Sequence, residues 1–162
     1  MEQIPAAEVL GSTVARHLRF QSQAELETVL DEPDQLLNYI SGVSSSFRNQ
    51  IGKIEMEEKQ RGSVFVALKS DGTSKLWYVF NARPASDALK LAVRKGMNAV
   101  QPIKMKQGTI VFGVALSLWG YKETPDEERE VIIPAEWTAA GKKLGGDHPA
   151  SKLALAAWDT GD

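Results

Sequence analysis

The side chains that most often perform catalysis are scarce in this sequence. Cysteine is absent from the 162 residues, which excludes disulfides, thiolate metal sites and cysteine nucleophiles. The two histidines, His17 and His148, lie far apart, and neither has a second histidine or an aspartate at the spacing of a metal site. We therefore predict a non-enzymatic protein that needs no metal or cofactor. An active site built from aspartate, glutamate, lysine or serine without histidine stays open.

Two further segments carry residue types that bind phosphate or cations in other proteins. Residues 141–146 (GKKLGG) combine lysines with glycines, but not in the order of a phosphate-binding loop. The end of a helix followed by a flexible glycine pair explains them better. The carboxylates of Asp126, Glu127, Glu128 and Glu130 lack the alternation and the glycine of a calcium loop. We expect a solvated acidic turn there.

Basic residues concentrate in the middle of a chain whose net charge is only −2. Between Lys69 and Lys122 there are nine basic and two acidic residues, so this segment carries +7 and the remainder −9. Five of these residues form a candidate partner-binding patch: Lys90, Arg94, Lys95, Lys104 and Lys106. The patch suits an anionic protein partner or nucleic-acid phosphates, although a plain solvated face is the simplest interpretation. The alternative function is therefore a nucleic-acid-associated or regulatory protein that acts through this patch, although the acidic overall balance makes nucleic acid the less favoured partner.

Hydrophobic periodicity predicts the elements that carry these residues. Apolar residues at spacings of three or four predict helices within 1–31, over 34–54 and after Ser86. Alternating residues predict strands over 63–69, 76–81 and 109–118. Because glycine tolerates a positive φ, Asp71-Gly72 between the first two strands is typical of a hairpin turn.

The last part of the chain is less regular. Pro125 indicates a loop within the acidic residues 123–130, which a short strand over 130–133 follows. Helices are expected over 134–144 and 149–158.

This order of elements predicts an α+β fold. We expect a small antiparallel sheet packed on amphipathic helices, with extra N-terminal helices and a C-terminal extension. The chain divides into an N-terminal helical segment (1–33), an α+β core (34–120) and an acidic loop with a helical extension (121–162).

The strand over 109–118 is the leading candidate for partner binding. Phe112, Leu116 and Leu118 lie on one face, and the smaller residues of the other face are either close-packed or exposed. We predict that this strand is a sheet edge to which a partner strand, or a second copy of the chain, adds. The partner-binding residues are then Thr109, Val111, Gly113, Ala115 and Ser117.

Residues 47–120 resemble the C-terminal domains of the bacterial energy-transducing proteins TonB and TolA. The shared features are an amphipathic helix leading into Arg61-Gly62-Ser63-Val64, the Asp71-Gly72 hairpin, a helix, Pro102 in the next connection and a strand that ends on Trp119-Gly120. The resemblance implies an adaptor, a binding module that presents a sheet edge and loops to a partner peptide. The proteins of that family also carry a membrane anchor and a spacer, which have no counterpart in this sequence. Conversely, residues 1–33 and 121–162 have no counterpart in the family.

The longest apolar runs are much shorter than the roughly 20 residues that a transmembrane helix needs. Residues 1–10 do not have the basic and apolar blocks of a secretory signal. As written, the chain is expected to be cytoplasmic. A trimmed piece of an anchored or secreted protein would instead be periplasmic.

Overall fold

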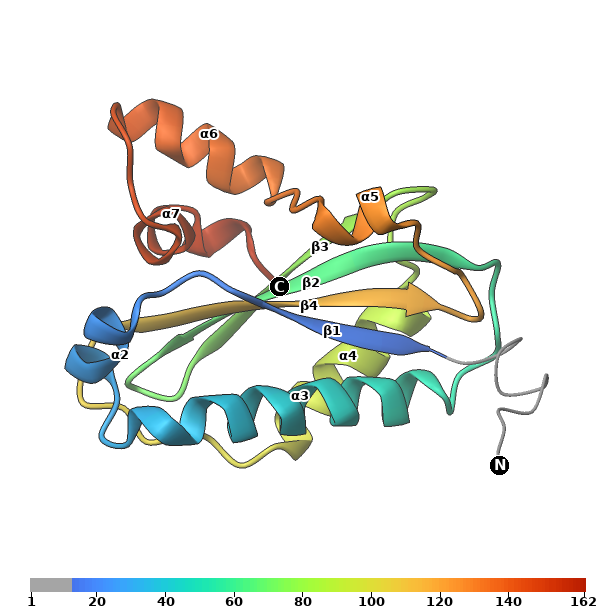
Figure 1. Ribbon diagram of the computed structural model, residues 1–162, viewed down its shortest axis with the longest axis horizontal. Coiled ribbons are helices and arrows are strands. Elements are labelled where there is room, and N and C mark those ends of the chain that lie inside the picture. The colour runs from blue at the N-terminus through green and yellow to red at the C-terminus, as the bar shows by residue number, and fades with distance from the viewer. Residues whose placement is uncertain (1–12) are drawn as a thin grey trace.

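The computed structural model describes residues 13–162 and shows an α+β architecture in three layers (Figure 1). The middle layer is an antiparallel sheet with the strand order β1-β4-β2-β3. Its strands are β1 (Val14–Arg19), β2 (Gln60–Lys69), β3 (Ser74–Phe80) and β4 (Thr109–Leu118). The α+β class with a small antiparallel sheet packed on helices, as predicted, is therefore confirmed.

Helices cover both faces of the sheet. The lower face in Figure 1 is covered by α3 (Leu36–Ile51) and α4 (Asp87–Ala99), and α2 (Gln23–Val29) closes one end. The upper face is covered by α5 (Pro125–Arg129), α6 (Ala135–Leu144) and α7 (Ala150–Ala156). Short 3-10 turns occupy Pro33–Gln35 and Trp158–Thr160. The N-terminal part of the chain thus contributes strand β1 to the sheet, the central part contributes β2, β3 and β4, and the C-terminal helices pack on its upper face.

The elements with the strongest local signals form as expected. Gly72 has φ 90° in the hairpin turn, a conformation that costs a residue with a side chain. The Ser86 hydroxyl caps α4 by accepting the N–H of Leu89 at 3.1 Å. Helices α3 and α4 meet closely at Gly96, where a Cβ would lie 3.0 Å from Phe47. This close approach allows α3 and α4 to form one apolar surface under the sheet.

Each face of the sheet has its own apolar core. Beneath the sheet, the α3 residues Ile40, Val43 and Phe47 are fully buried in a cluster that includes the lower-face residues of β2, β3 and β4. Above it, Trp137 of α6 packs with its ring edge-on to Trp77, the ring centroids 5.3 Å apart. The second face of β4 is thus close-packed, and all ten residues of β4 are buried.

The N-terminal helix prediction is wrong where the structure tests it. Residues 14–19 form β1 rather than part of a helix, and the predicted helical residues 1–12 lie outside the described part. The four-residue spacing of Val14 and Leu18 fits two strand repeats as well as one helical turn. The helix predicted to begin at Ser22 does form, as α2, and the Ser22 hydroxyl caps it by accepting the N–H of Glu25 at 3.2 Å.

The acidic segment also differs from its prediction. Pro125 begins α5 instead of marking a loop, because proline fits the first helical turn and Thr124 and Glu127 form a reciprocal capping box. Residues 130–133 pair with no strand among residues 13–162. They cross above the sheet toward α6 instead of running along one of its edges (Figure 1).

Candidate functional site

The predicted edge strand is in fact a central strand. Strand β4 pairs with β2 on one side and with β1 on the other. The predicted partner-binding residues Thr109, Val111, Gly113, Ala115 and Ser117 are all buried. The prediction that their backbone binds a partner strand is therefore wrong, because this position is filled by a strand of the same chain.

Strand β1 is extended on this side by a side chain. The amide of Gln21 donates to the carbonyl of Thr109 and accepts the N–H of Val111, both at 3.0 Å. The backbone groups of these two residues therefore point toward the β1 side. Backbone groups alternate in direction along an antiparallel strand, so the N–H and C=O groups of Gly113, Ala115 and Ser117 also point toward β1 and bond to it.

The open edge of the sheet is the outer side of β1. Val14, Arg16 and Leu18 oppose the bonded β4 residues, so Ala15, His17 and Arg19 turn their N–H and C=O groups outward. None of these outward groups has a backbone partner among residues 13–162. In Figure 1, β1 lies on the near side of the sheet with α3 beneath it. Three residues of this six-residue strand thus offer their backbone groups to an added strand.

The opposite edge, on β3, is partly closed. Leu76 exchanges two backbone hydrogen bonds with Asp162, at 3.3 and 2.9 Å. The Arg94 guanidinium donates to the Ser74 hydroxyl at 2.8 Å and to the Asp162 carbonyl at 2.6 Å. Only the far end of β3, around Tyr78, keeps outward backbone groups without such partners in the described part of the chain. The longer open edge therefore belongs to β1.

The open edge is basic. Arg16, His17 and Arg19 lie on β1, and Arg19 is exposed. Arg48 of α3 reaches the start of the strand, where its Nε donates to the Thr13 carbonyl at 3.0 Å. No acidic residue occurs between Thr13 and Gln21.

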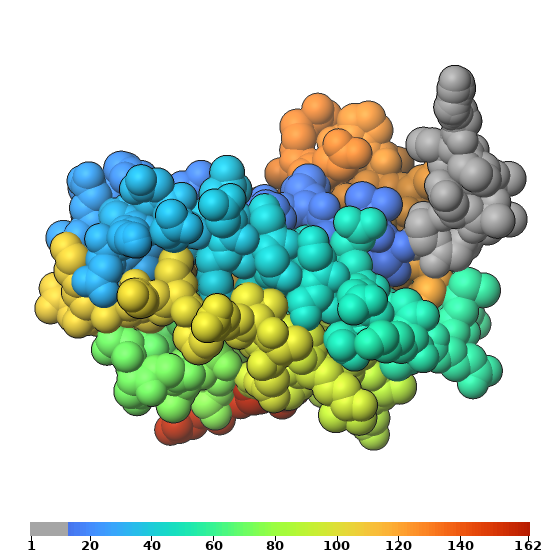
Figure 2. Space-filling model, turned by 90° about the horizontal axis from the view of Figure 1, so that it is seen from below, coloured from blue at the N-terminus to red at the C-terminus, as the bar shows by residue number. Residues whose placement is uncertain are grey.

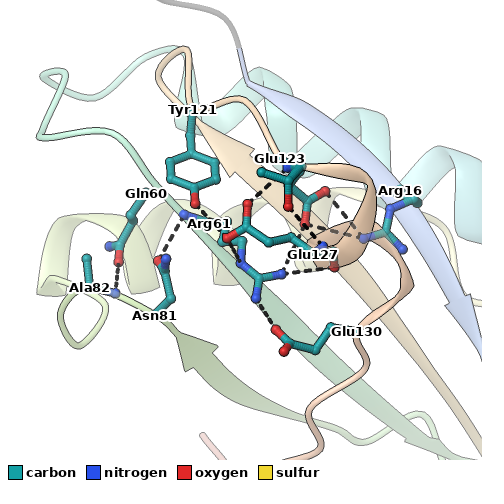
Figure 3. Close-up of polar contacts among 10 residues, drawn as sticks. Arg16, Gln60, Arg61, Asn81, Ala82, Tyr121, Glu123, Glu127 and Glu130 are labelled. Carbon is teal, nitrogen blue, oxygen red and sulfur yellow. Dashed lines mark hydrogen bonds and ion pairs between the residues drawn. The ribbon is translucent and has the colours of Figure 1, made fainter.

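Arg61 of β2 is the centre of an ion-pair network that crosses over β4 and includes Arg16 of β1 (Figure 3). Its guanidinium lies 3.3 Å from Glu123 and 3.1 Å from Glu127, and it also contacts Glu130 and the Glu127 carbonyl. Arg16 pairs with the other oxygen of Glu123 at 3.3 Å. The Arg61 Nε lies near Glu127 but outside hydrogen-bond geometry. The network fixes α5 to the sheet and holds Arg16 against it.

Hydrogen bonds in this network change the acidity of two members. The Thr124 backbone N–H, followed by the Tyr121 hydroxyl, lowers the pKa of the Glu127 carboxyl. The same hydroxyl donates to Glu127 at 2.8 Å, and that bond is the largest cause of the raised pKa of Tyr121. Glu127 therefore stays ionised and Tyr121 stays protonated at neutral pH, so both keep these contacts. Asp126, Glu128 and Glu130 are exposed as expected, whereas Glu127 is partly buried and holds α5 to Arg61 of the sheet.

The predicted basic patch is divided between two places. Lys90 lies 5.5 Å above the Tyr78 ring, and Arg94 bonds to the hairpin as described above. Lys106, in the connection after α4, donates to the Glu27 carbonyl at 3.3 Å. Lys95 and Lys104 are exposed. Three of the five side chains thus have intramolecular contacts.

The other candidates for chemistry do not converge. His17 lies on β1, and the ring of His148 contacts the Gly145 carbonyl at 2.6 Å. Gly145 ends α6 with φ 71°, as expected for a helix end. Within residues 13–162, no three histidine, aspartate or glutamate side chains come together as a metal site would require. Every helix in the same range is too short or too polar to span a bilayer.

No protein-family model, curated protein or solved structure matches this chain.

Proposed function

We propose that this protein is an interaction module that binds an extended, acidic segment of a partner protein along the outer edge of β1. The open backbone of Ala15, His17 and Arg19 is the observation that carries the proposal. Strand addition uses such groups for affinity, while side chains on alternate faces give selectivity. The resemblance to TonB and TolA domains, which stays a prediction, implies the same class of function.

The charge of β1 favours an acidic partner over a second copy of the chain. Pairing two β1 strands would bring the exposed Arg19 of both copies into one ladder, and like charges in facing positions are destabilising. An acidic strand would instead meet the exposed Arg19 and the half-buried His17. Basic side chains on an edge strand also hinder the addition of neutral strands, which leads to aggregation. The charges on β1 therefore disfavour neutral partner strands.

Two capped heptapeptides test the proposal, one alternating valine with glutamate and the other valine with lysine. We expect the acidic peptide to bind and to perturb the amide resonances of Ala15, His17 and Arg19, and the basic peptide not to bind. Exposed ion pairs contribute about 0.2–1 kcal/mol each and are screened by salt. Affinity for the acidic peptide should therefore fall as salt is added.

A matched pair of charge reversals separates this edge from the basic helix. Arg19→Glu and Lys95→Glu both reverse an exposed basic residue, the first on β1 and the second on α4. We expect Arg19→Glu to weaken binding of the acidic peptide roughly three- to tenfold, and Lys95→Glu to leave it unchanged. The opposite pattern would move the site to α4. If instead the protein dimerises without peptide, and Arg19→Glu makes the dimer more stable, the β1 edge binds a second copy of the chain.

A further inference from the structure

A large hollow lies beside the hairpin turn and shares no lining residue with the Arg61 network. It has a volume of about 560 Å³, within the usual range of small-molecule sites. Its walls come from the hairpin turn, the end of α4 and the connection from α4 to β4, and Tyr39 of α3 also lines it. A second hollow of about 380 Å³ lies between α3 and the same connection.

The connection between α4 and β4 separates the two hollows. Val100, Pro102 and Ile103 line both of them, as does Tyr39. Figure 2 shows this segment along the lower surface, between α3 and the hairpin. Its far end is fixed to the end of α2, where Met105 bridges to Leu30 and Lys106 donates its N–H to the Val29 carbonyl at 2.7 Å.

The middle of the connection has no such anchors. Residues 101–104 form no hydrogen bond with any other residue between 13 and 162. Ile103 is only half-buried. A segment fixed at its ends and free of hydrogen bonds between them can shift at small cost. The two hollows can therefore adapt to one ligand.

Tyr39 supplies a polar group at the junction of the hollows. Its ring is held edge-on to Phe112, with the centroids 6.0 Å apart. Its hydroxyl bonds to no residue of the described part, yet it is not completely enclosed by protein. Burial raises the pKa of Tyr39 to about 12, so the phenol keeps its proton and can donate a hydrogen bond.

We propose that the two hollows, which share Tyr39 and the α4–β4 connection as walls, together bind a neutral, mainly apolar small molecule whose carbonyl or ether oxygen accepts a hydrogen bond from Tyr39. The walls supply apolar side chains such as Met97, Ile103 and Met105, and methionine adapts readily to ligand shape. The charged lining residues are two acidic and two basic ones, namely Asp31, Glu32, Lys69 and Lys104. The lining therefore offers no concentrated charge to a strongly ionic ligand.

The neutral naphthyl ketone dye Prodan is a suitable probe, since it has an apolar body and one carbonyl acceptor. We expect saturable binding at one site, with a blue shift of its emission. Tyr39→Phe removes only the hydroxyl and should weaken binding roughly three- to tenfold, the usual range for one hydrogen bond. The anionic dye anilinonaphthalene sulfonate should bind more weakly than Prodan.

Gly42 provides a variant that fills the groove. A Cβ at Gly42 would lie 3.9 Å from Val100, so a leucine there enters the hollow between α3 and the connection. Leucine is also a better helix former than glycine, which protects the fold. Ser41→Leu, at an exposed position on α3 that lines neither hollow, is the matched control.

Gly42→Leu should reduce Prodan affinity more than tenfold, whereas Ser41→Leu should not change it. Equal binding by the wild type and Gly42→Leu would overturn the proposal, as would the absence of saturable binding. Tighter binding of the anionic dye would overturn the neutral ligand class. The peptide titration at β1 should be the same in all these variants, so the two proposals can fail separately.

Discussion

Replacement of Arg61 by methionine would show how far the ion-pair network stabilises the upper layer. The Arg61 side chain is 14% exposed and contacts three carboxylates, of which only Glu123 has a second arginine partner. Breaking a fully buried ion pair costs about 3–5 kcal/mol. Because Glu130 is half exposed and Glu127 reaches water, we expect a loss of about 2–3 kcal/mol here.

For a domain of this size, 1 kcal/mol lowers Tm by roughly 2–4 °C, so Arg61→Met should lower it by roughly 4–12 °C. Amide hydrogen exchange should accelerate first at Glu128 and Glu130, whose N–H groups bond within the anchored segment. Arg129→Met is the control, since Arg129 pairs with Asp126 on the exposed side of α5 and should contribute less than about 0.5 kcal/mol. Equal effects of the two substitutions would refute the proposed anchor.

Three further outcomes are expected. Gly72→Val should lower the free energy of unfolding in urea by roughly 1–3 kcal/mol, entirely through backbone strain, because a Cβ there meets no atom within 4 Å. Ala115→Pro removes an N–H that bonds to β1, so it should unfold the central strand or lower Tm by more than roughly 6 °C. His17→Pro removes an N–H that points outward and should shift Tm by only a few degrees. Similar melting curves of the two variants would contradict the assignment of β4 as central and β1 as the edge. The pKa of Glu127 is lowered on folding, so its stabilisation is present above the ordinary value of 4.5 and is lost as the pH falls through its folded value. Urea titrations between neutral and acidic pH should accordingly show a flatter acid dependence for Glu127→Gln.

Local signals in the sequence were sufficient for the centre of the fold. The hairpin depends on Asp71-Gly72, and α4 begins at a serine cap, so both follow from neighbouring residues. The stripe of α3 likewise follows from its period. These elements need no knowledge of distant partners.

The position of β4 could not be predicted in the same way. An alternating strand reads identically in the centre and at the edge of a sheet, and its neighbour β1 lies about 100 residues earlier in the chain. The apolar residues Val14 and Leu18, four apart, fit either period. Because residues 14–19 are predicted as a helix, no strand is left to pair with the outer side of β4, and β4 is therefore predicted as an edge.

The ion-pair network and the hollows share this limitation. Arg61 meets its carboxylates more than 60 residues later, and nothing in either segment signals the pairing. Tyr39 follows Leu36 at helical spacing and so reads as an ordinary core residue. Its exposure to a hollow depends on residues 100–105, which have no periodic pattern.

The long sequence separation between β1 and β4 has a consequence for synthesis of the protein. Ribosomes add about 5–20 residues per second, so β1 precedes its partner strand by about 5–20 s. During that interval the nascent chain exposes a short strand that is unpaired on both sides. The hairpin can form as soon as it leaves the ribosome, since its strands are adjacent and such hairpins close within microseconds. Closure of the sheet by β1 is thus a late event of biogenesis, and mutations that weaken β1 should reduce the yield of folded protein in cells more than they reduce its measured stability.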